Sequence, residues 1–262
     1  MTKLVVVGGG RMGEALVRGL LAATWATASE ITVVESGAAR RGELEDLLPG
    51  VALAAAPVTG SEAVVAVKPA DVEAACRSLA AAGVGRVLSI AAGVGLANLE
   101  RWLGPKVSVV RAMPNTPALI GAGAAAVAAG ATATDDDVAW AMSILASVGT
   151  VVSVPESQLD AVTGLSGSGP AYVFLVAEAM IEAGVLAGLT RATSASLVGQ
   201  TLLGAARLLV EGDDGPEALR AAVTSPGGTT AAGLQVLEDR AVRAAFLAAV
   251  QAATERSRHL GG

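Results

Sequence analysis

The chain has 262 residues, a formal net charge of −6 and an aromatic content of 2%. Nucleic-acid binding requires basic patches and stacking aromatic side chains, so this composition excludes it. One histidine excludes a histidine-rich metal site, and we expect no metal; one cysteine excludes an intrachain disulfide, which is typical of a reducing compartment.

Short apolar runs alternate with helical stretches over the first 154 residues. The runs predict buried strands at 4–7, 31–34, 63–67, 87–90 and 107–110, with further strands near 124–129 and 150–154. Helices are predicted near 11–23, 38–48, 70–82, 95–103 and 136–147. This alternation is typical of βαβ units, so we expect a Rossmann-like α/β domain whose parallel sheet carries helices on both faces.

The pattern changes at residue 155, after which no strand is expected. Helices are predicted near 156–164, 168–187, 191–211, 215–223, 229–237 and 240–259. The sequence therefore predicts two domains: a dinucleotide-binding domain at 1–154 and an all-helical domain at 155–262.

Two of the C-terminal helical stretches lack a polar face. Residues 171–189 carry Glu178 and Glu182 as their only charges, and residues 192–206 carry none. A helix that is apolar all round must be covered on every side. We expect a second copy of the chain to supply that cover, which makes the helical domain a dimerisation domain. A monomeric bundle of five or six helices is the alternative.

The hydrophobic content of 53% does not predict a membrane protein, because much of it is alanine. A spanning helix needs about 20 strongly apolar residues, whereas the longest stretch without charge, 112–134, contains prolines and glycines. The N-terminus leads directly into a strand pattern and a glycine turn, unlike a signal peptide. We expect a cytoplasmic protein with no membrane contact.

Gly8, Gly10 and Gly13 form the pattern GxGxxG between the first predicted strand and the first predicted helix. In that context the first glycine makes a tight turn, the second lets backbone approach a pyrophosphate, and the third packs helix on strand. The helix N-terminus then meets the negative charge. The pattern predicts a dinucleotide cofactor, with a plain tight turn as the alternative.

Glu35 ends the second predicted strand, about 20 residues after the last glycine, where an acidic side chain accepts hydrogen bonds from the adenosine ribose of NADH. Arg40 and Arg41 follow closely and are able to hold the 2′-phosphate of NADPH. The choice between NADPH and NADH stays open at this point.

Further candidate residues follow the fourth and fifth predicted strands, at the sheet edge where such folds bind ligands. Val67, Lys68 and Pro69 close the fourth strand. Ala91, Ala92 and Gly93 follow the fifth, and their small side chains leave room for a nicotinamide ring.

Two dense motifs stand in the C-terminal half, GLSGSGPAY at 164–172 and VTSPGGTT at 223–230. The second predicts a tight turn at Pro226 to Gly228 that opens a helix. Backbone N–H groups near Gly228, Thr229 and Thr230 would point outward as a site for a carboxylate. An ordinary capped turn is the alternative.

Residues 224–238, TSPGGTTAAGLQVLE, closely resemble the signature of the pyrroline-5-carboxylate reductase family. Supporting matches occur in the same order at 8–13, 66–69, 111–117 and 165–172. The resemblance extends over essentially the whole chain. It implies NAD(P)H-dependent reduction of 1-pyrroline-5-carboxylate to L-proline, the last step of proline biosynthesis. It also implies a helical domain that interlocks with a partner subunit, with dimers often built into larger rings.

The resemblance also implies roles for individual residues. Ser225, Gly228, Thr229 and Thr230 would hold the substrate carboxylate and ring nitrogen, with Thr230 as the catalytic hydroxyl. The cofactor-binding residues would be Gly8, Gly10, Arg11, Met12, Gly13, Glu35, Ser36, Ala66, Val67, Lys68, Pro69, Ala91, Ala92, Gly93 and Asn115. The chain departs from some relatives at 51–60, which lacks an asparagine near the adenosine ribose, and at Glu35-Ser36, where other members carry neutral or basic pairs.

Other candidates for catalysis have plainer explanations. His259 stands at the end of the last predicted helix, where a cation complements the helix dipole. Cys76 lies inside a predicted helix as a small core residue. A hydroxyacid dehydrogenase would need a lysine or histidine as proton donor, and no lysine occurs after Lys106. A non-catalytic dinucleotide sensor of the same fold stays open.

Overall fold

The computed structural model describes residues 2–56 and 58–261. The chain divides into two compact units. The first contains residues up to 168 together with those from 251 onward, and the second contains Gly169–Val250.

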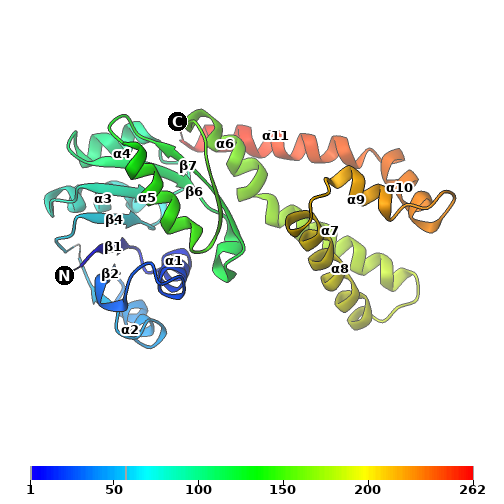
Figure 1. Cartoon of the computed structure of the whole chain (residues 1–262), viewed down its shortest axis with the longest axis horizontal. Helices are drawn as coiled ribbons and strands as arrows, with labels where there is room; N and C mark the ends of the chain where they lie inside the picture. The colour runs from blue at the N-terminus through cyan, green and yellow to red at the C-terminus, as the bar shows by residue number, and fades with distance from the viewer. Residues whose placement is uncertain (1, 57, 262) are drawn as a thin grey trace. The chain divides into compact units, whose positions relative to one another are not determined.

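An eight-stranded sheet forms the centre of the first unit (Figure 1). Its strands, in chain order, are β1 Leu4–Val7, β2 Ile31–Val34, β3 Ala52–Ala54, β4 Glu62–Val65, β5 Arg86–Ser89, β6 Ser108–Met113, β7 Gly123–Ala129 and β8 Gly149–Ser153. The spatial order is β3-β2-β1-β4-β5-β6-β7-β8. The chain therefore starts in the middle and winds outward in both directions, so the order reverses between β1 and β4. Ligands of such sheets bind at this reversal, beside the carboxyl ends of the strands.

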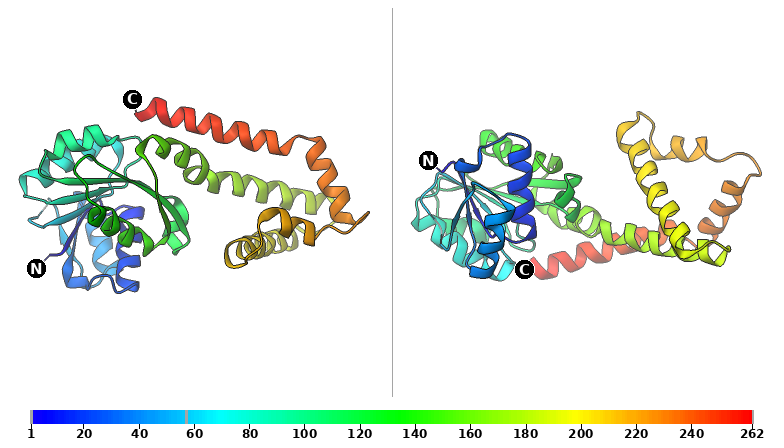
Figure 2. Two further views of the ribbon diagram at one scale, coloured as in Figure 1. Left: turned by 45° about the horizontal axis from the view of Figure 1, so that its top comes forward. Right: turned by 90° about the horizontal axis from the view of Figure 1, so that it is seen from below.

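Helices cover both faces of this sheet, as Figures 1 and 2 show. They are α1 Arg11–Ala22, α2 Ala38–Leu47, α3 Val72–Ala81, α4 Leu96–Leu103 and α5 Asp135–Ala146. Successive side chains of β1 alternate between two cores. Leu4 and Val6 join the core that contains residues of α1, α2 and α5. Val5 and Val7 join the core that contains residues of α3 and α4. Both faces are buried, which explains why the strands are continuously apolar.

The predicted fold class is confirmed, and seven of the eight strands were expected from the sequence. Strand β3 was missed because it has three residues and the sequence ALA, which gives no strand signal. Strands β6 and β7 pair antiparallel. A short connection through a 3-10 turn at Thr116–Ile120 joins them, whereas a parallel pair would need a longer crossover.

The segment after β8 is helical almost without interruption. Helix α6, Leu159–Val162, continues into a π-helical turn at Thr163–Gly167, and α7 begins at Gly169. The last residues of the chain return to the first unit, where the Ser257 hydroxyl donates to Asp160 Oδ1 at 2.7 Å. The predicted limits of 1–154 and 155–262 match the end of the last strand, and as domain limits they stay a prediction.

The second unit is helical, as expected. It contains α7 Gly169–Leu186, α8 Arg191–Glu211, α9 Pro216–Ala222, α10 Thr229–Asp239 and the first part of α11 Val242–Gly261. Helices α7 and α8 lie side by side, and the Ser194 hydroxyl donates to the Ile181 carbonyl at 2.9 Å.

The apolar side chains of this unit are largely uncovered. Phe174 is 63% exposed, Leu175 65% and Leu186 91%. No residue of α7 is buried, and α8 buries Ser194 and Val198. This exposure argues against the monomeric bundle, because a solvated monomer does not leave such faces bare.

The stretch Glu156–Leu186 has a mean hydropathy of 1.4 and is long enough to cross a membrane by length and composition alone. None of its most apolar window is buried within the chain. Its last part belongs to the apolar stretch 171–189, for which the sequence predicts cover by a second copy of the chain.

Helix α2 offers a test of how the core supports the glycine turn. Leu44 is fully buried and a Cβ placed on Gly9 would lie 2.5 Å from its Cδ1, whereas Leu47 on the same helix is 37% exposed. We expect Leu44→Ala to lower the free energy of unfolding by about 2–5 kcal/mol and Leu47→Ala to lower it by less than about 1 kcal/mol. Denaturant titration of both variants measures this, and equal losses would contradict the packing described.

Candidate functional site

The backbone of the glycine turn between β1 and α1 lies very close to neighbouring backbone atoms. Gly8 has φ +109°, and a Cβ there would lie 2.5 Å from the carbonyl oxygen of Ala66. A Cβ on Gly13 would overlap the carbonyl oxygen of Gly8. Gly8 is therefore required by the backbone conformation, and Gly13 by the close approach of the helix.

Gly10 differs from these two glycines. It is exposed, stands at the N-cap of α1 with φ −67°, and a Cβ there would meet nothing within 4 Å. No side chain caps this helix, and its first backbone bond runs from the Glu14 N–H to the Gly10 carbonyl. The space above Gly10 is open and faced by the N–H groups of a helix start, which is the geometry of a phosphate site.

A cavity of about 500 Å³ adjoins this turn. Among the residues predicted from the sequence, seven line it: Gly8, Gly10, Glu35, Ser36, Ala66, Val67 and Lys68. The cavity is also lined by residues that the sequence motifs did not predict, among them Ala55, Ala56, Asp71 and Ser78. Ala55 and Ala56 follow the unpredicted strand β3, and Asp71 and Ser78 belong to the turn and helix after β4. The cavity has the volume and the position of a dinucleotide site.

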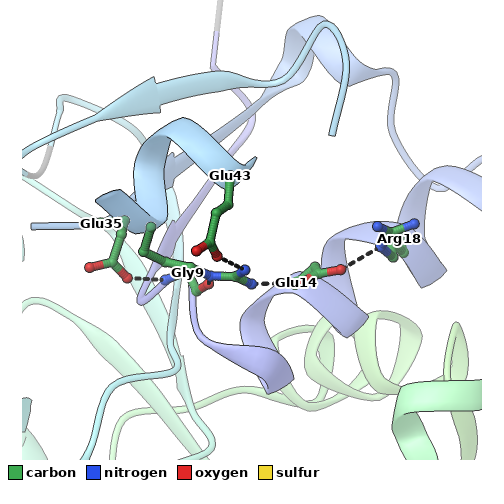
Figure 3. Close-up of polar contacts among 6 residues, drawn as sticks. Gly9, Glu14, Arg18, Glu35 and Glu43 are labelled. Atoms are coloured by element: carbon green, nitrogen blue, oxygen red, sulfur yellow. Dashed lines mark hydrogen bonds and ion pairs between the residues drawn. The ribbon is translucent and has the colours of Figure 1, made fainter. Parts of the chain in front are cut away.

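The carboxylate of Glu35 is fixed to the backbone around this turn. Its Oε2 accepts from the Gly9 N–H at 3.1 Å (Figure 3), and its Oε1 accepts from the Gly37 N–H at 2.8 Å. Gly37 is the N-cap of α2, so one carboxylate joins the glycine turn to the next helix.

Arg40 binds the next peptide group of the glycine turn, through the Gly9 carbonyl. Its Nε donates to the Gly9 carbonyl at 2.8 Å, one terminal nitrogen donates to Glu43 at 2.8 Å, and the other to Glu14 at 2.5 Å. Glu14 also accepts from Arg18 at 2.7 Å (Figure 3). Burial alone would raise the pKa of Glu14, but the hydrogen bonds from Arg40 and Arg18 outweigh it and lower that pKa.

Arg41 is bound to backbone. One of its terminal nitrogens donates to the carbonyls of Glu35 at 2.7 Å and Ser36 at 2.9 Å. Neither Arg40 nor Arg41 is among the residues that line the cavity.

A second cavity of about 380 Å³ lies in the same unit, beyond β4 and β5. The predicted residues Pro69, Ala92 and Gly93 line it, and Ala91 is buried beside it at 4% exposure. The other lining residues, which the sequence analysis did not select, are Thr163, Ser168, Ala253, Arg256, Ser257 and Leu260. The last four stand far away in the sequence and reach this edge because the end of α11 returns to the first unit. His259 is exposed and is not one of them.

The remaining predicted cofactor residues have other contacts. The amide of Asn115 donates to the Ser166 carbonyl at 3.0 Å and accepts from the Ala124 N–H at 2.8 Å, so it joins three segments of backbone. Met12 packs against the core, and Arg11 lines a separate surface hollow. Their roles beside the cofactor stay predictions.

The four predicted substrate residues lie together in the second unit, at the start of α10. Gly227 has φ +68°, and the Gly228 N–H donates to the Ser225 carbonyl at 3.0 Å. Gly228 is the N-cap and no side chain caps the helix. Thr230 is half-buried in the first turn and Thr229 is exposed. The geometry is that of an open helix N-terminus, which suits a carboxylate.

Cys76 is fully buried in the core between the sheet and α3, α4. Burial raises the pKa of its thiol to about 11, so the thiol stays protonated at neutral pH. A protonated, buried thiol is a poor nucleophile, which confirms its role as a core residue.

Two family descriptions match the chain. Residues 156–260 match pyrroline-5-carboxylate reductase dimerisation, and residues 3–93 match NADP oxidoreductase coenzyme F420-dependent. The first match contains the stretch Glu156–Leu186, so its exposed apolar surface belongs to a region typical of subunit pairing.

Similar proteins extend over the full length. The pyrroline-5-carboxylate reductase of Synechocystis is 44% identical over 99% of this chain and 98% of its own length, and that of Mycobacterium tuberculosis is 42% identical over 99% and 97%. A solved reductase structure from Coxiella burnetii has a TM-score of 0.94 and 36% identity over 100% of this chain and 99% of its own. The Plasmodium falciparum enzyme, solved with NADP bound, has a TM-score of 0.84 and 29% identity over 100% and 98%.

The open space above Gly10 can be tested directly. Because a Cβ at this position meets no protein atom, we expect Gly10→Ala to fold normally and to weaken dinucleotide binding by about tenfold or more, since the methyl group occupies the space for the pyrophosphate. Gly42→Ala is the matched control, because Gly42 also has free space around it but lies in α2. Fluorescence titration measures both affinities. Unchanged dinucleotide binding by Gly10→Ala would show that this turn does not bind the cofactor's pyrophosphate.

Proposed function

The chain belongs to the pyrroline-5-carboxylate reductase family, and from that premise we propose that it reduces 1-pyrroline-5-carboxylate to L-proline with NADPH or NADH, the last step of proline biosynthesis. The observation that carries this proposal is the full-length similarity to reductases at 44% identity, combined with an open glycine turn beside a cavity of dinucleotide size.

Different residues of the first unit would bind different parts of the cofactor. The uncapped start of α1 above Gly10 would hold the pyrophosphate, and the small residues Ala92 and Gly93 would leave room for the nicotinamide. When bound, the reduced nicotinamide supplies a hydride to C5 of the cyclic imine. The imine nitrogen takes a proton and becomes the amine of proline.

The start of α10 would hold the substrate. Its free N–H groups around Thr229 and Thr230 suit the carboxylate, and the Thr230 hydroxyl would hydrogen-bond the ring nitrogen and relay its proton. A protonated imine is already electrophilic, so no strongly titrating acid is required. Positioning then supplies most of the barrier reduction, up to ~7–11 kcal/mol in well-oriented systems.

The chain carries the family's dimerisation region over residues 156–260. The exposed apolar side chains of α7, such as Phe174 and Leu175, support pairing with a second copy. We further propose that dimers assemble into a ring, and native mass spectrometry would give the number of subunits. We also propose that the protein works in the cytoplasm, where its one buried cysteine stays reduced.

The activity is tested by mixing the purified protein with 1-pyrroline-5-carboxylate and NADPH or NADH, and following the absorbance of the reduced nicotinamide. We expect that absorbance to fall and proline to accumulate in equal amount. Omission of the substrate is the control. Cofactor binding without turnover would favour the alternative, a non-catalytic dinucleotide sensor.

The role of Thr230 is tested by two substitutions. We expect Thr230→Ala to lower kcat by about 100-fold, the usual range for loss of a proton-transfer group, with little change in cofactor affinity. Thr230→Ser keeps the hydroxyl and should retain most of the turnover. If the alanine variant turned over at the normal rate, Thr230 would have no part in the reaction.

A further inference from the structure

We propose that Glu35 makes this chain selective for NADH over NADPH, an inference that rests on the proposed function and adds the identity of its reductant. Glu35 ends β2 and lines the large cavity, at the place where the adenosine ribose of a dinucleotide lies in this fold. The two cofactors differ at that ribose, by a 2′-hydroxyl in NADH and a 2′-phosphate in NADPH.

The carboxylate is fixed in position before any ligand arrives. Both of its oxygens accept backbone hydrogen bonds, from Gly9 at 3.1 Å and from Gly37 at 2.8 Å. A carboxylate oxygen accepts more than one donor, so Glu35 is still able to accept a ribose hydroxyl. To make room for a phosphate the side chain would have to break both backbone bonds and leave their N–H groups without an acceptor.

The nearby arginines do not offset this negative charge toward the cavity. Arg40 engages all three of its guanidinium nitrogens, with the Gly9 carbonyl and the carboxylates of Glu43 and Glu14. Arg41 donates to the carbonyls of Glu35 and Ser36. Neither arginine lines the cavity, so the geometry favours a ribose carboxylate over a phosphate-binding arginine pair.

The other charges of the cavity do not favour a phosphate either. Its charged lining residues are Glu35, Asp71 and Lys68, two acids and one base. Lys68 follows β4, which lies on the opposite side of β1 from β2. A 2′-phosphate beside Glu35 would place like charges in contact, whereas a hydroxyl donates to the same oxygen. Discrimination by such a repulsive contact is a common means of specificity.

Arg40 has a different part in this arrangement. It donates to the Gly9 carbonyl, while Glu35 accepts from the Gly9 N–H, so the two side chains fix the two successive peptide groups that flank the Gly9 Cα. Arg40 is a positioning residue, and its loss should weaken the binding of both cofactors to the same extent.

The test measures dissociation constants of NADH and NADPH by fluorescence titration without substrate, so it does not depend on turnover. We expect the unmodified protein to bind NADH at least about tenfold more tightly. Glu35→Gln should reduce this ratio by about tenfold or more because it removes the charge, and Glu35→Asp, which keeps the charge, should retain a preference for NADH. Arg40→Gln should weaken both cofactors equally.

Equal or tighter binding of NADPH by the unmodified protein would overturn the proposal, and that result needs no variant to fold. A loss confined to NADPH in Arg40→Gln, or an unchanged ratio in Glu35→Gln with native circular dichroism, would also overturn it. Failure to reduce 1-pyrroline-5-carboxylate despite a clear NADH preference would contradict the proposed function and leave the role of Glu35 standing.

Discussion

The close approach of α1 to strands β1 and β4 is the constraint on which the site depends. No side chain fits at Gly8 or Gly13, because a Cβ would meet the carbonyl oxygens of Ala66 and Gly8. That approach leaves the start of α1 uncapped and facing open space at Gly10. The first N–H groups of α1 have no intrahelical partners, and in the proposed function they would bind the phosphate of the cofactor. Packing against strands β1 and β4 determines the position of α1, and the start of α1 determines where the negative charge of a ligand would bind.

Three carboxylates and two arginines stabilise this turn from outside. Glu35 accepts from the N–H of Gly9 and Arg40 donates to the carbonyl of Gly9, and Glu14 and Glu43 neutralise Arg40. Burial opposes the charge of Glu14, yet the hydrogen bonds from arginines lower its pKa, so it remains ionised at neutral pH. One network therefore does two things. It fixes the backbone of the glycine turn, and it binds Arg40 outside the cavity, which is the basis of the proposal that the carboxylate of Glu35 distinguishes between cofactors.

The local patterns of the sequence were sufficient to locate seven strands of the first unit and its glycine turn. Continuous apolar runs located the strands because both faces of the sheet are buried, and GxGxxG located Gly8, Gly10 and Gly13 because their backbone demands are local. Strand β3 and its neighbours Ala55 and Ala56 gave no such signal. Arg256 and Ser257 could not be predicted from local patterns, because they line the second cavity only through the return of the end of α11 to the first unit. The hydrogen-bond partners of Arg40 and Arg41 depend on side-chain geometry, so the spacing of residues in the sequence does not predict them.

The second unit obeys a different constraint, because its own contacts do not bury its apolar surface. Helix α7 buries no residue, and Leu186 stays 91% exposed. Burial of such side chains supplies the main favourable term in folding, so a partner subunit completes the core that this unit lacks. The residues proposed to bind substrate, at the start of α10, belong to this unit. The first unit has its own two buried cores and a cavity of dinucleotide size, whereas the second leaves its apolar surface for association. In the proposed function, the reductant would therefore bind to one folded unit, and the imine acid would bind to a unit that association completes.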